Sequence, residues 1–288
     1  MLVILLAALA AIGWGASDYF GGDTSRRDVP VFAIVAMAEL AGAVMMLPVL
    51  AARGILPPAR PGLALAAMAG VAVTIELGLI YRALGSGHAF ITAPVGALGA
   101  AMAATVGLIT GDPISLTITA GLAFALLGAG ISSWTSPARS SNGAPAQTAA
   151  ICLAAAASVA IALTCLHTAG RVDPYWATFT EHASTALSAA LIAIVGRRRS
   201  PRPSRRSLPG RCQLPALAII AVTGLGGDLA YTTASGHGTL SIVAAISSLY
   251  PITTIVLGLL MKGTRPTRIQ LAGITLALLG ATLLSAAR

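Results

Sequence analysis

Five of the nine acidic residues in this chain fall inside long apolar segments, where a carboxylate is costly to place. These residues are Asp18, Glu39, Glu76, Glu181 and Asp228. A charged side chain at the centre of a bilayer costs about 2.5 to 3.5 kcal/mol, so an acid kept there normally faces a cavity and has a function. In a dehydrated cavity a carboxyl group can bind and release a proton. We therefore predict that these five acids couple protons or bind a substrate.

Aromatic and polar side chains accompany the acids and are candidates for lining the same cavity. Trp14 and Asp18 are four residues apart and share one helical face, so a ring and a carboxylate can together bind a cation. An interfacial position of the ring is the alternative for Trp14. Pro251 frees a backbone carbonyl that can line a cavity, or it only kinks the helix. The lining candidates are Trp14, Tyr19, His182, Tyr231, Ser247 and Tyr250.

The composition requires a membrane to position these residues. Apolar residues make up 56% of the 288 residues and charged residues only 9%, whereas soluble domains have about a quarter charged. Ten apolar segments are each long enough to cross about 30 Å of hydrocarbon as a helix. The sequence therefore predicts an all-α integral membrane protein. The ten segments are 2–20, 31–52, 63–82, 89–109, 114–134, 149–169, 176–196, 214–234, 240–261 and 268–286.

The second half of the chain repeats the first. The sequence GLAFALLG at Gly121–Gly128 returns 152 residues later as GITLALLG at Gly273–Gly280. Upstream of these stretches, seven identical residues recur at a spacing of 151. We predict two repeats of five helices, 1–144 and 145–288. Because five is an odd number, the second copy enters the membrane from the opposite face, which gives an inverted repeat.

Glycines mark the last helix of each predicted repeat. Those at 121 and 128, and those at 273 and 280, are seven residues apart and therefore lie on one helical face. Small residues in this pattern let two membrane helices approach closely. We predict that these four glycines serve helix packing.

The basic residues predict the orientation in the membrane. Of the 18 Lys and Arg residues, 14 fall in alternate loops, and the segment 197–213 holds seven arginines. By the positive-inside rule these loops are cytoplasmic and both termini lie outside. The arginines contact lipid headgroups, so no nucleic-acid partner is expected. Seventeen arginines against one lysine are typical of a bacterial protein of the cytoplasmic (plasma) membrane.

No pattern in the sequence indicates a cofactor, a metal site or a catalytic centre. Cys152, Cys165 and Cys212 form no paired motif, so neither a disulfide framework nor a metal site is predicted. No HExxH, nucleophile elbow or phosphate-binding loop occurs. We expect a protein that is not an enzyme.

The sequence resembles the EamA-type, ten-helix permeases of the drug/metabolite transporter superfamily over essentially its whole length. The resemblance is carried by WGASD at Trp14–Asp18, by LYP at Leu249–Pro251, and by the two glycine-bounded helix ends described above. Small-residue turns at 83–87 and 234–238 add to it. One departure is Gly263-Thr264, where the family often has an acid after the glycine; Gly111-Asp112 keeps that pattern.

The resemblance implies secondary transport, commonly export, of a small organic solute through a central cavity between the two halves. It also implies cytoplasmic termini, opposite to the orientation that the arginines indicate. From the acids we expect proton exchange for a cationic or zwitterionic solute, such as an amine, an amino acid or a lipophilic drug. An intramembrane enzyme acting on a lipid-linked substrate and a non-transporting assembly partner remain alternatives. Both a monomer and a homodimer are compatible with the sequence.

Overall fold

The computed structural model describes residues 1–25, 30–58, 60–85, 95–132, 145–199, 213–263 and 265–286, and within these ranges the ordered elements are helices. The Arg-rich stretch 200–212 and the end of the predicted turn 83–87 lie outside the described residues. The helices are α1 (Leu2–Ser25), α2 (Val31–Arg53), α3 (Arg60–Gly85), α5 (Val95–Ile109), α6 (Leu116–Ser132), α7 (Pro145–Gly170), α8 (Pro174–Arg199), α9 (Leu214–Ser235), α10 (Leu240–Ser247), α11 (Tyr250–Lys262) and α12 (Arg268–Ala286).

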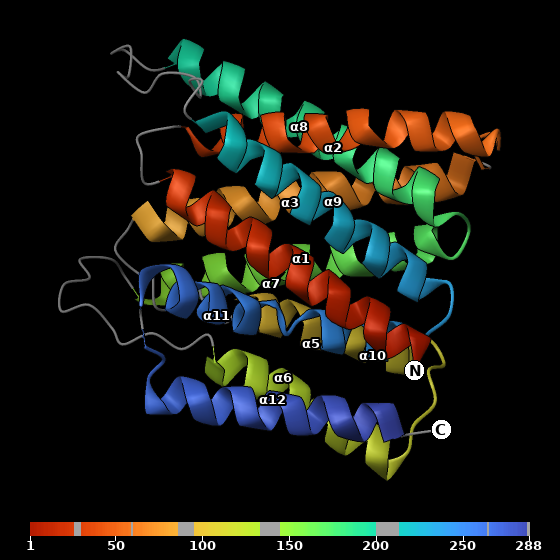
Figure 1. The fold of residues 1–288 in the computed structure, drawn as a ribbon, viewed down its shortest axis with the longest axis vertical. Coiled ribbons are helices and arrows are strands. Elements are labelled where there is room, and N and C mark those ends of the chain that lie inside the picture. Colours follow the sequence, from red (N-terminus) through yellow and green to blue (C-terminus); the bar gives the residue numbers. More distant parts are fainter. Residues whose placement is uncertain are drawn as a thin grey trace.

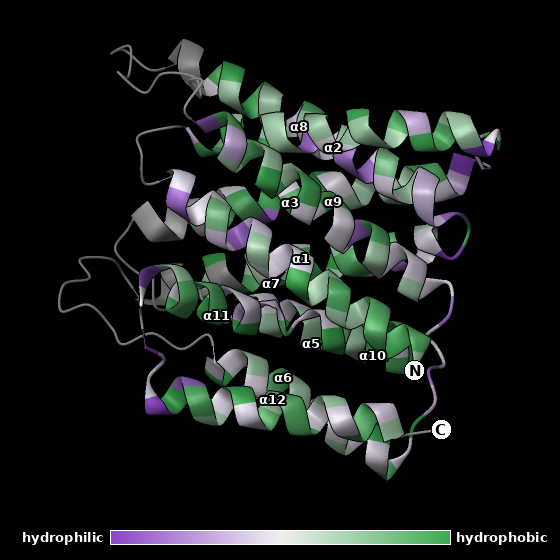
Figure 2. Ribbon diagram, in the orientation of Figure 1, coloured by the Kyte–Doolittle hydropathy of each residue, from purple (hydrophilic) through white to green (hydrophobic). Residues whose placement is uncertain are grey.

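These helices confirm the predicted all-α membrane architecture. Eight spans are long and apolar enough to cross a membrane, and α5 and α6 are shorter apolar helices. The ninth predicted span is divided into α10 and α11, with a break at Ser248 and Leu249. Pro251 lies in the first turn of α11, where a proline's missing N–H costs no helical hydrogen bond. Apolar residues cover most of the helical surface (Figure 2).

The two halves interleave. The helix α1 packs on α9, and its counterpart pair, α3 and α7, packs in the same way. The contacts α2 with α8, α5 with α10, and α6 with α12 each join a helix to its equivalent in the other half. Exchanging the halves therefore leaves these main contacts unchanged, as expected for two inverted five-helix repeats. Figure 1 shows α6 and α12 side by side at one edge of the bundle.

Small residues bring the halves into close contact. A Cβ at Gly13 of α1 would lie 2.8 Å from the Cα of Gly227 of α9, so these two backbones touch directly. The four glycines of α6 and α12 face one another in the same manner: a Cβ at Gly121 would meet Leu284 of α12, and Cβ atoms at Gly128, Gly273 and Gly280 would meet the opposite backbone. Without a hydrophobic drive between helices in lipid, such close van der Waals packing holds the halves together.

Both termini lie at the same end of the bundle, at the right in Figure 1. The C-terminal end of α2 and the α7–α8 connection lie at this end as well. The opposite end of the bundle holds the last turn of α1, the first turn of α2, the end of α11 with Lys262 and the start of α12 with Arg268 (Figure 1). The bundle thus has a terminal end and a basic end, and we use these names below.

Candidate functional site

A cavity of about 260 Å³ lies between the two halves and is lined by residues of both. All five predicted acids line it: Asp18 from α1, Glu39 from α2, Glu76 from α3, Glu181 from α8 and Asp228 from α9. Within the described part of the chain its lining contains no Lys, Arg or His side chain. The cavity therefore concentrates five carboxyl groups in an otherwise apolar interior, and any that are ionised favour a cationic occupant.

One wall of the cavity is a connected cluster, which we call the histidine wall: Glu39, Glu181, His182 and Asp228. The Nδ1 atom of His182 forms an ion-pair contact with Oε2 of Glu39, and its Nε2 atom lies 3.2 Å from Oδ2 of Asp228. The other carboxylate oxygen of Asp228 accepts a hydrogen bond of 2.8 Å from Nε1 of Trp14. Since Glu39 belongs to the first half and Asp228 to the second, His182 joins the two repeats at the cavity.

Glu181 is the most deeply buried of these acids, with 3% of its surface exposed. The hydroxyl of Thr185, one helical turn further along α8, donates a hydrogen bond of 2.7 Å to Oε1 of Glu181. Its Oε2 atom is buried and has no hydrogen-bond partner among the residues that the structure describes. Glu181 therefore offers a carboxylate oxygen that a proton or a bound cation can satisfy.

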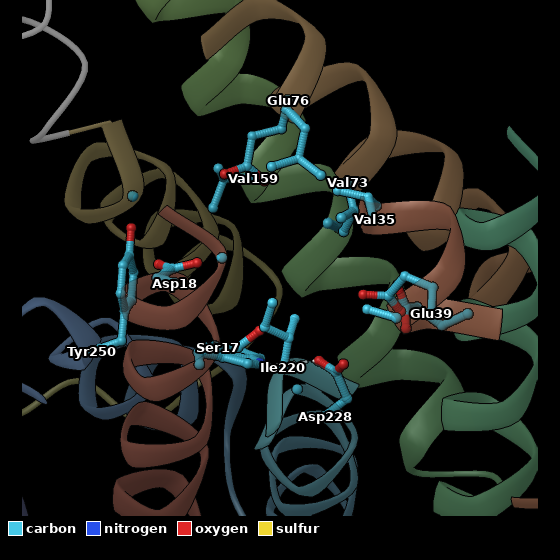
Figure 3. A pocket seen from close by; sticks show the side chains of 18 of the residues that line it. Ser17, Asp18, Val35, Glu39, Val73, Glu76, Val159, Ile220, Asp228 and Tyr250 are labelled. Carbon is cyan, nitrogen blue, oxygen red and sulfur yellow. Dashed lines mark hydrogen bonds between the residues drawn. The ribbon is translucent and has the colours of Figure 1, made fainter. Parts of the chain in front are cut away.

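The opposite wall, which we call the open wall, consists of Asp18, Glu76 and Tyr250. Figure 3 shows Asp18 beside Tyr250, with Glu39 and Asp228 on the other side of the cavity. Asp18 of α1, Glu76 of α3 and Tyr250 of α11 all line the cavity. Among the described residues, neither carboxylate has a hydrogen bond or an ion pair. A positive charge on this wall must therefore come from outside the described residues.

The histidine wall also contains donors that can hold a metal ion. One ligand atom each from Glu39, Glu181 and His182 lies within 4.8 Å of the others. Carboxylate oxygen and imidazole nitrogen together suit divalent metals such as zinc or manganese. No sequence pattern indicated such a set, because its members come from two helices, α2 and α8, that are far apart in the chain.

The comparisons with known proteins agree with this architecture. The model of the EamA-like transporter family matches residues 147–286, which is the second repeat. This match supports membership of the drug/metabolite transporter superfamily. Among solved structures, 28 chains match. One crystal structure, described only as that of a protein, aligns with a TM-score of 0.75 over 99% of this chain and 96% of its own, at 17% identity. That likeness concerns the fold alone. The sequence matches no curated protein.

In this EamA-like protein the remaining lining candidates occupy different places. Trp14 and Tyr250 line the cavity, whereas His182 lies behind Glu39 and Asp228. Tyr231 is fully buried, stacks on Trp14 with ring centroids 5.3 Å apart, and donates a hydrogen bond of 3.0 Å to the carbonyl of Leu163. Ser247 donates to the carbonyl of Ala7, and Tyr19 packs against Phe20. Tyr231, Ser247 and Tyr19 therefore stabilise the packing of helices around the cavity and do not line its surface.

The sequence analysis missed an ion pair that joins the halves at the terminal end. Arg53, the last residue of α2, makes two hydrogen bonds of 3.1 and 3.0 Å to the carboxylate of Asp173, just before α8. Its guanidinium also lies 4.1 Å from the ring centre of Tyr175, and Nε1 of Trp176 donates to the carbonyl of Ile55 at 3.1 Å. We call this group the terminal clasp. At the sequence level Arg53 was counted only as a loop charge, and nothing in the spacing of Arg53 and Asp173 pairs them.

The carboxylate of Asp173 is held in its charged form. Burial raises the pKa of Asp173, but the hydrogen bonds from Arg53 and from the backbone N–H groups of Trp176 and Tyr175 outweigh burial and lower the pKa overall. These two N–H groups belong to the first turn of α8, so Asp173 also caps that helix. The clasp is therefore a well-satisfied contact between the halves.

The cavity differs at its two ends. Its lining runs along α1 from Trp14 to Gly22, towards the basic end of the bundle, and both Asp18 and Gly22 remain exposed. At the terminal end, the clasp joins α2 of the first half to α8 of the second. The cavity lining thus extends towards the basic end, whereas the clasp joins the two halves at the terminal end.

Proposed function

We propose that this protein is a secondary active transporter that exchanges protons for a small organic solute that is cationic or zwitterionic, such as an amine, an amino acid or a lipophilic drug. The observation that carries the proposal is the convergence of five carboxylates on one cavity between the halves, with no basic side chain among the described lining residues. Such a cavity gains a proton or a cation at low cost, since either neutralises buried negative charge. Family membership supports transport as the general activity.

Alternating access supplies the transport step. In an inverted repeat, rocking one half against the other opens the central site to each side in turn. The open basic end and the clasped terminal end correspond to one of the two states. The return state requires the contact between Arg53 and Asp173 to break, since this contact ties α2 to α8.

Export follows if the basic end faces the cytoplasm, as the positive-inside rule predicts. The cavity then loads from the cytoplasm and releases outside, where protons enter. The proposed site of the protein is the bacterial plasma membrane, with the segment 197–213 on the cytoplasmic side. Lipids and protons are its other partners.

Ligand binding to the purified protein tests the proposal. A panel of amines, amino acids and lipophilic cations is screened by thermal shift at pH 6 and pH 8, since a ligand that binds only the native state raises its apparent stability. We expect a cation that stabilises the wild type more at pH 8 than at pH 6, with the effect reduced in Glu39→Gln and Glu76→Gln. Asp23→Asn is the matched control, because Asp23 lies on α1 beyond the cavity lining and contacts Lys262 at 2.5 Å. A folded wild type that binds none of the panel at either pH contradicts the proposal.

A further inference from the structure

Four buried side-chain atoms without a hydrogen-bond partner lie together in the histidine wall. They are Oε2 of Glu39, Oε2 of Glu181 and both ring nitrogens of His182, and the part of the chain that the structure describes contains six such atoms in all. Glu181 and His182 are 3% and 1% exposed. The ring nitrogens lie near the carboxylates of Glu39 and Asp228, but neither makes a hydrogen bond there. Since buried polar atoms are nearly always satisfied, these four atoms point to a ligand that binds among them.

The same three side chains bring metal ligands together. One ligand atom from each of Glu39, Glu181 and His182 lies within 4.8 Å of the others. This separation is comparable with the width of a zinc coordination sphere, in which each ligand lies about 2.1 Å from the ion. The Nδ1 atom of His182 contacts Oε2 of Glu39, so this ring nitrogen is directed towards an acid of the set. A group of unpartnered donors of this size fits a single ion.

The types of ligand select the kind of ion. Two carboxylates balance the two charges of a divalent cation, and a neutral imidazole contributes a nitrogen lone pair. Imidazole nitrogen suits zinc and other first-row transition metals, whereas magnesium and calcium bind oxygen ligands. Within the described residues the group includes no cysteine, so a soft ion such as copper(I) is not favoured. Zinc fits the set well, and manganese should bind the same ligands more weakly.

Neighbouring residues hold these ligands in position. The hydroxyl of Thr185 donates to Oε1 of Glu181 at 2.7 Å, which leaves Oε2 for an ion. On the other side of the imidazole, Nε2 lies 3.2 Å from Oδ2 of Asp228. In metal sites a carboxylate in this place orients the ring. A Cβ at Gly42 would lie 2.7 Å from Nδ1 of His182, so the glycine keeps this nitrogen uncovered.

The cavity gives an ion access to the ligands. Glu39 and Glu181 both line it, and three protein ligands leave a further coordination position for water from the lumen. Glu39 belongs to α2 of the first half, whereas Glu181 and His182 belong to α8 of the second half. An ion bound by all three therefore connects the two halves.

We infer that Glu39, Glu181 and His182 bind a divalent transition-metal ion, with zinc as the best fit, and that this ion joins α2 to α8 beside the cavity. The site goes beyond the proposed function and does not depend on it, because its ligands are complete without a solute or a proton gradient. The ion adds a second link between the two halves, which the terminal clasp also connects.

Zinc binding to the purified protein tests the inference. The full chain, with its purification tag removed, is treated with EDTA and dialysed against zinc chloride, and mass spectrometry measures the bound zinc per chain. We expect one tightly bound ion in the wild type and in His167→Gln. His167 is the matched control, because it is also buried in a membrane helix with an unpartnered ring nitrogen but belongs to no ligand group among the described residues.

The variants of the site should lose affinity in a graded way. Thr185→Val removes only a group that orients a ligand, which should weaken zinc binding about 10- to 100-fold. His182→Gln and Glu181→Gln each remove a ligand and should weaken it by more than about 100-fold. A wild type that binds no zinc, or ligand variants that bind it as tightly as the wild type, would overturn the inference.

X-ray absorption at the zinc edge identifies the ligands in the wild type, so the result does not depend on the folding of any variant. The inference predicts one imidazole and otherwise oxygen ligands at about 2.0 to 2.2 Å. Sulfur at about 2.3 Å, or more than one imidazole, would place the ion elsewhere on the chain and overturn the inference. Neither measurement uses an organic cation, so failure of the metal site leaves the proposed function intact, and failure of the cation panel leaves the metal site intact.

Discussion

The two walls of the cavity contain the same chemical groups but differ in what satisfies them. On the histidine wall, Asp228 contacts His182 and Trp14, Glu39 contacts His182, and Glu181 accepts from Thr185. On the open wall, Asp18 and Glu76 have no such partner among the described residues and face the lumen. A carboxylate in an apolar interior needs compensation. On the histidine wall, side chains of the protein compensate the carboxylates. On the open wall, the compensation comes from what enters the cavity.

This difference suggests a division of labour within the proposed transport cycle. The open wall is suited to attract and hold the solute, because no protein cation has to leave first. The histidine wall is suited to hold its carboxylates in place, because His182 already contacts Glu39 and Asp228. The predictions below test this division, from the largest expected effect to the smallest.

Removing one charge from the open wall should have the largest effect. Glu76→Gln is expected to weaken binding of the best cation from the panel about tenfold to a hundredfold, since a bond to a charged group contributes about 1.5 to 3 kcal/mol and 1.4 kcal/mol is tenfold in affinity. Isothermal titration at pH 8 measures the change. Asp23→Asn, on a carboxylate outside the lining, should leave the affinity unaltered. If Glu76→Gln binds as well as the wild type, the open wall does not hold the solute.

Filling the space under His182 should disturb the histidine wall alone. Gly42→Ala places a methyl group within 3 Å of the ring, and overpacking of this kind costs about 1 to 3 kcal/mol of unfolding free energy. Denaturant unfolding in mixed micelles measures it. Gly226→Ala is the matched control, because a Cβ on that residue of α9 would meet nothing within 4 Å. Equal stability of the two variants would mean that the ring is not held against Gly42.

The hydrogen bond from Trp14 to Asp228 should make a smaller contribution. Trp14→Phe keeps an aromatic ring near Tyr231 but removes the Nε1 donor. Hydrogen bonds between membrane helices contribute about 0.6 kcal/mol on average and at most about 1.7. A double-mutant cycle with Asp228→Asn should show a coupling in this range. Strictly additive effects would indicate that the two side chains do not interact.

The smallest effect concerns the terminal clasp. There the carboxylate of Asp173 is paired with Arg53 and does not line the cavity. Because the pKa of Asp173 is lower in the folded protein than in the unfolded chain, its stabilisation is complete above the unfolded value of about 3.9 and is lost as the pH falls through the folded value. Between pH 5 and pH 3 the wild type should therefore lose more thermal stability than Asp173→Asn. Parallel curves for the two proteins would contradict this.

The fold could be predicted from the sequence because the length and apolarity of each segment determine whether it spans a membrane as a helix. Ten apolar segments and a duplication imply ten helices in two repeats, and the proline at 251 falls at the break between α10 and α11. The acids were found for a similar reason, since any charge inside an apolar segment is conspicuous. Their grouping into two walls was not predictable. Which carboxylate meets His182 depends on how α2, α8 and α9 rotate and pack, and a single sequence contains no signal for that.

One weak signal for the histidine wall was present. Gly42 follows Glu39 by three residues, so both share a face of α2. A glycine at this position leaves space beside Glu39 for a side chain from another helix, here that of His182. The partners of the clasp had no comparable signal, because Arg53 and Asp173 are 120 residues apart and stand at helix ends where charges are ordinary.

Proton flux in proteoliposomes is the most direct test of the central claim that the acid-lined cavity exchanges protons for a solute cation. Vesicles containing a pH-sensitive dye and the wild-type protein are exposed to an inward gradient of the cation that binds best. The account predicts that cation entry drives protons out, so that the lumen becomes more alkaline, and that Glu39→Gln and Glu76→Gln both weaken this flux. Cation transport by the wild type without any movement of protons would contradict it.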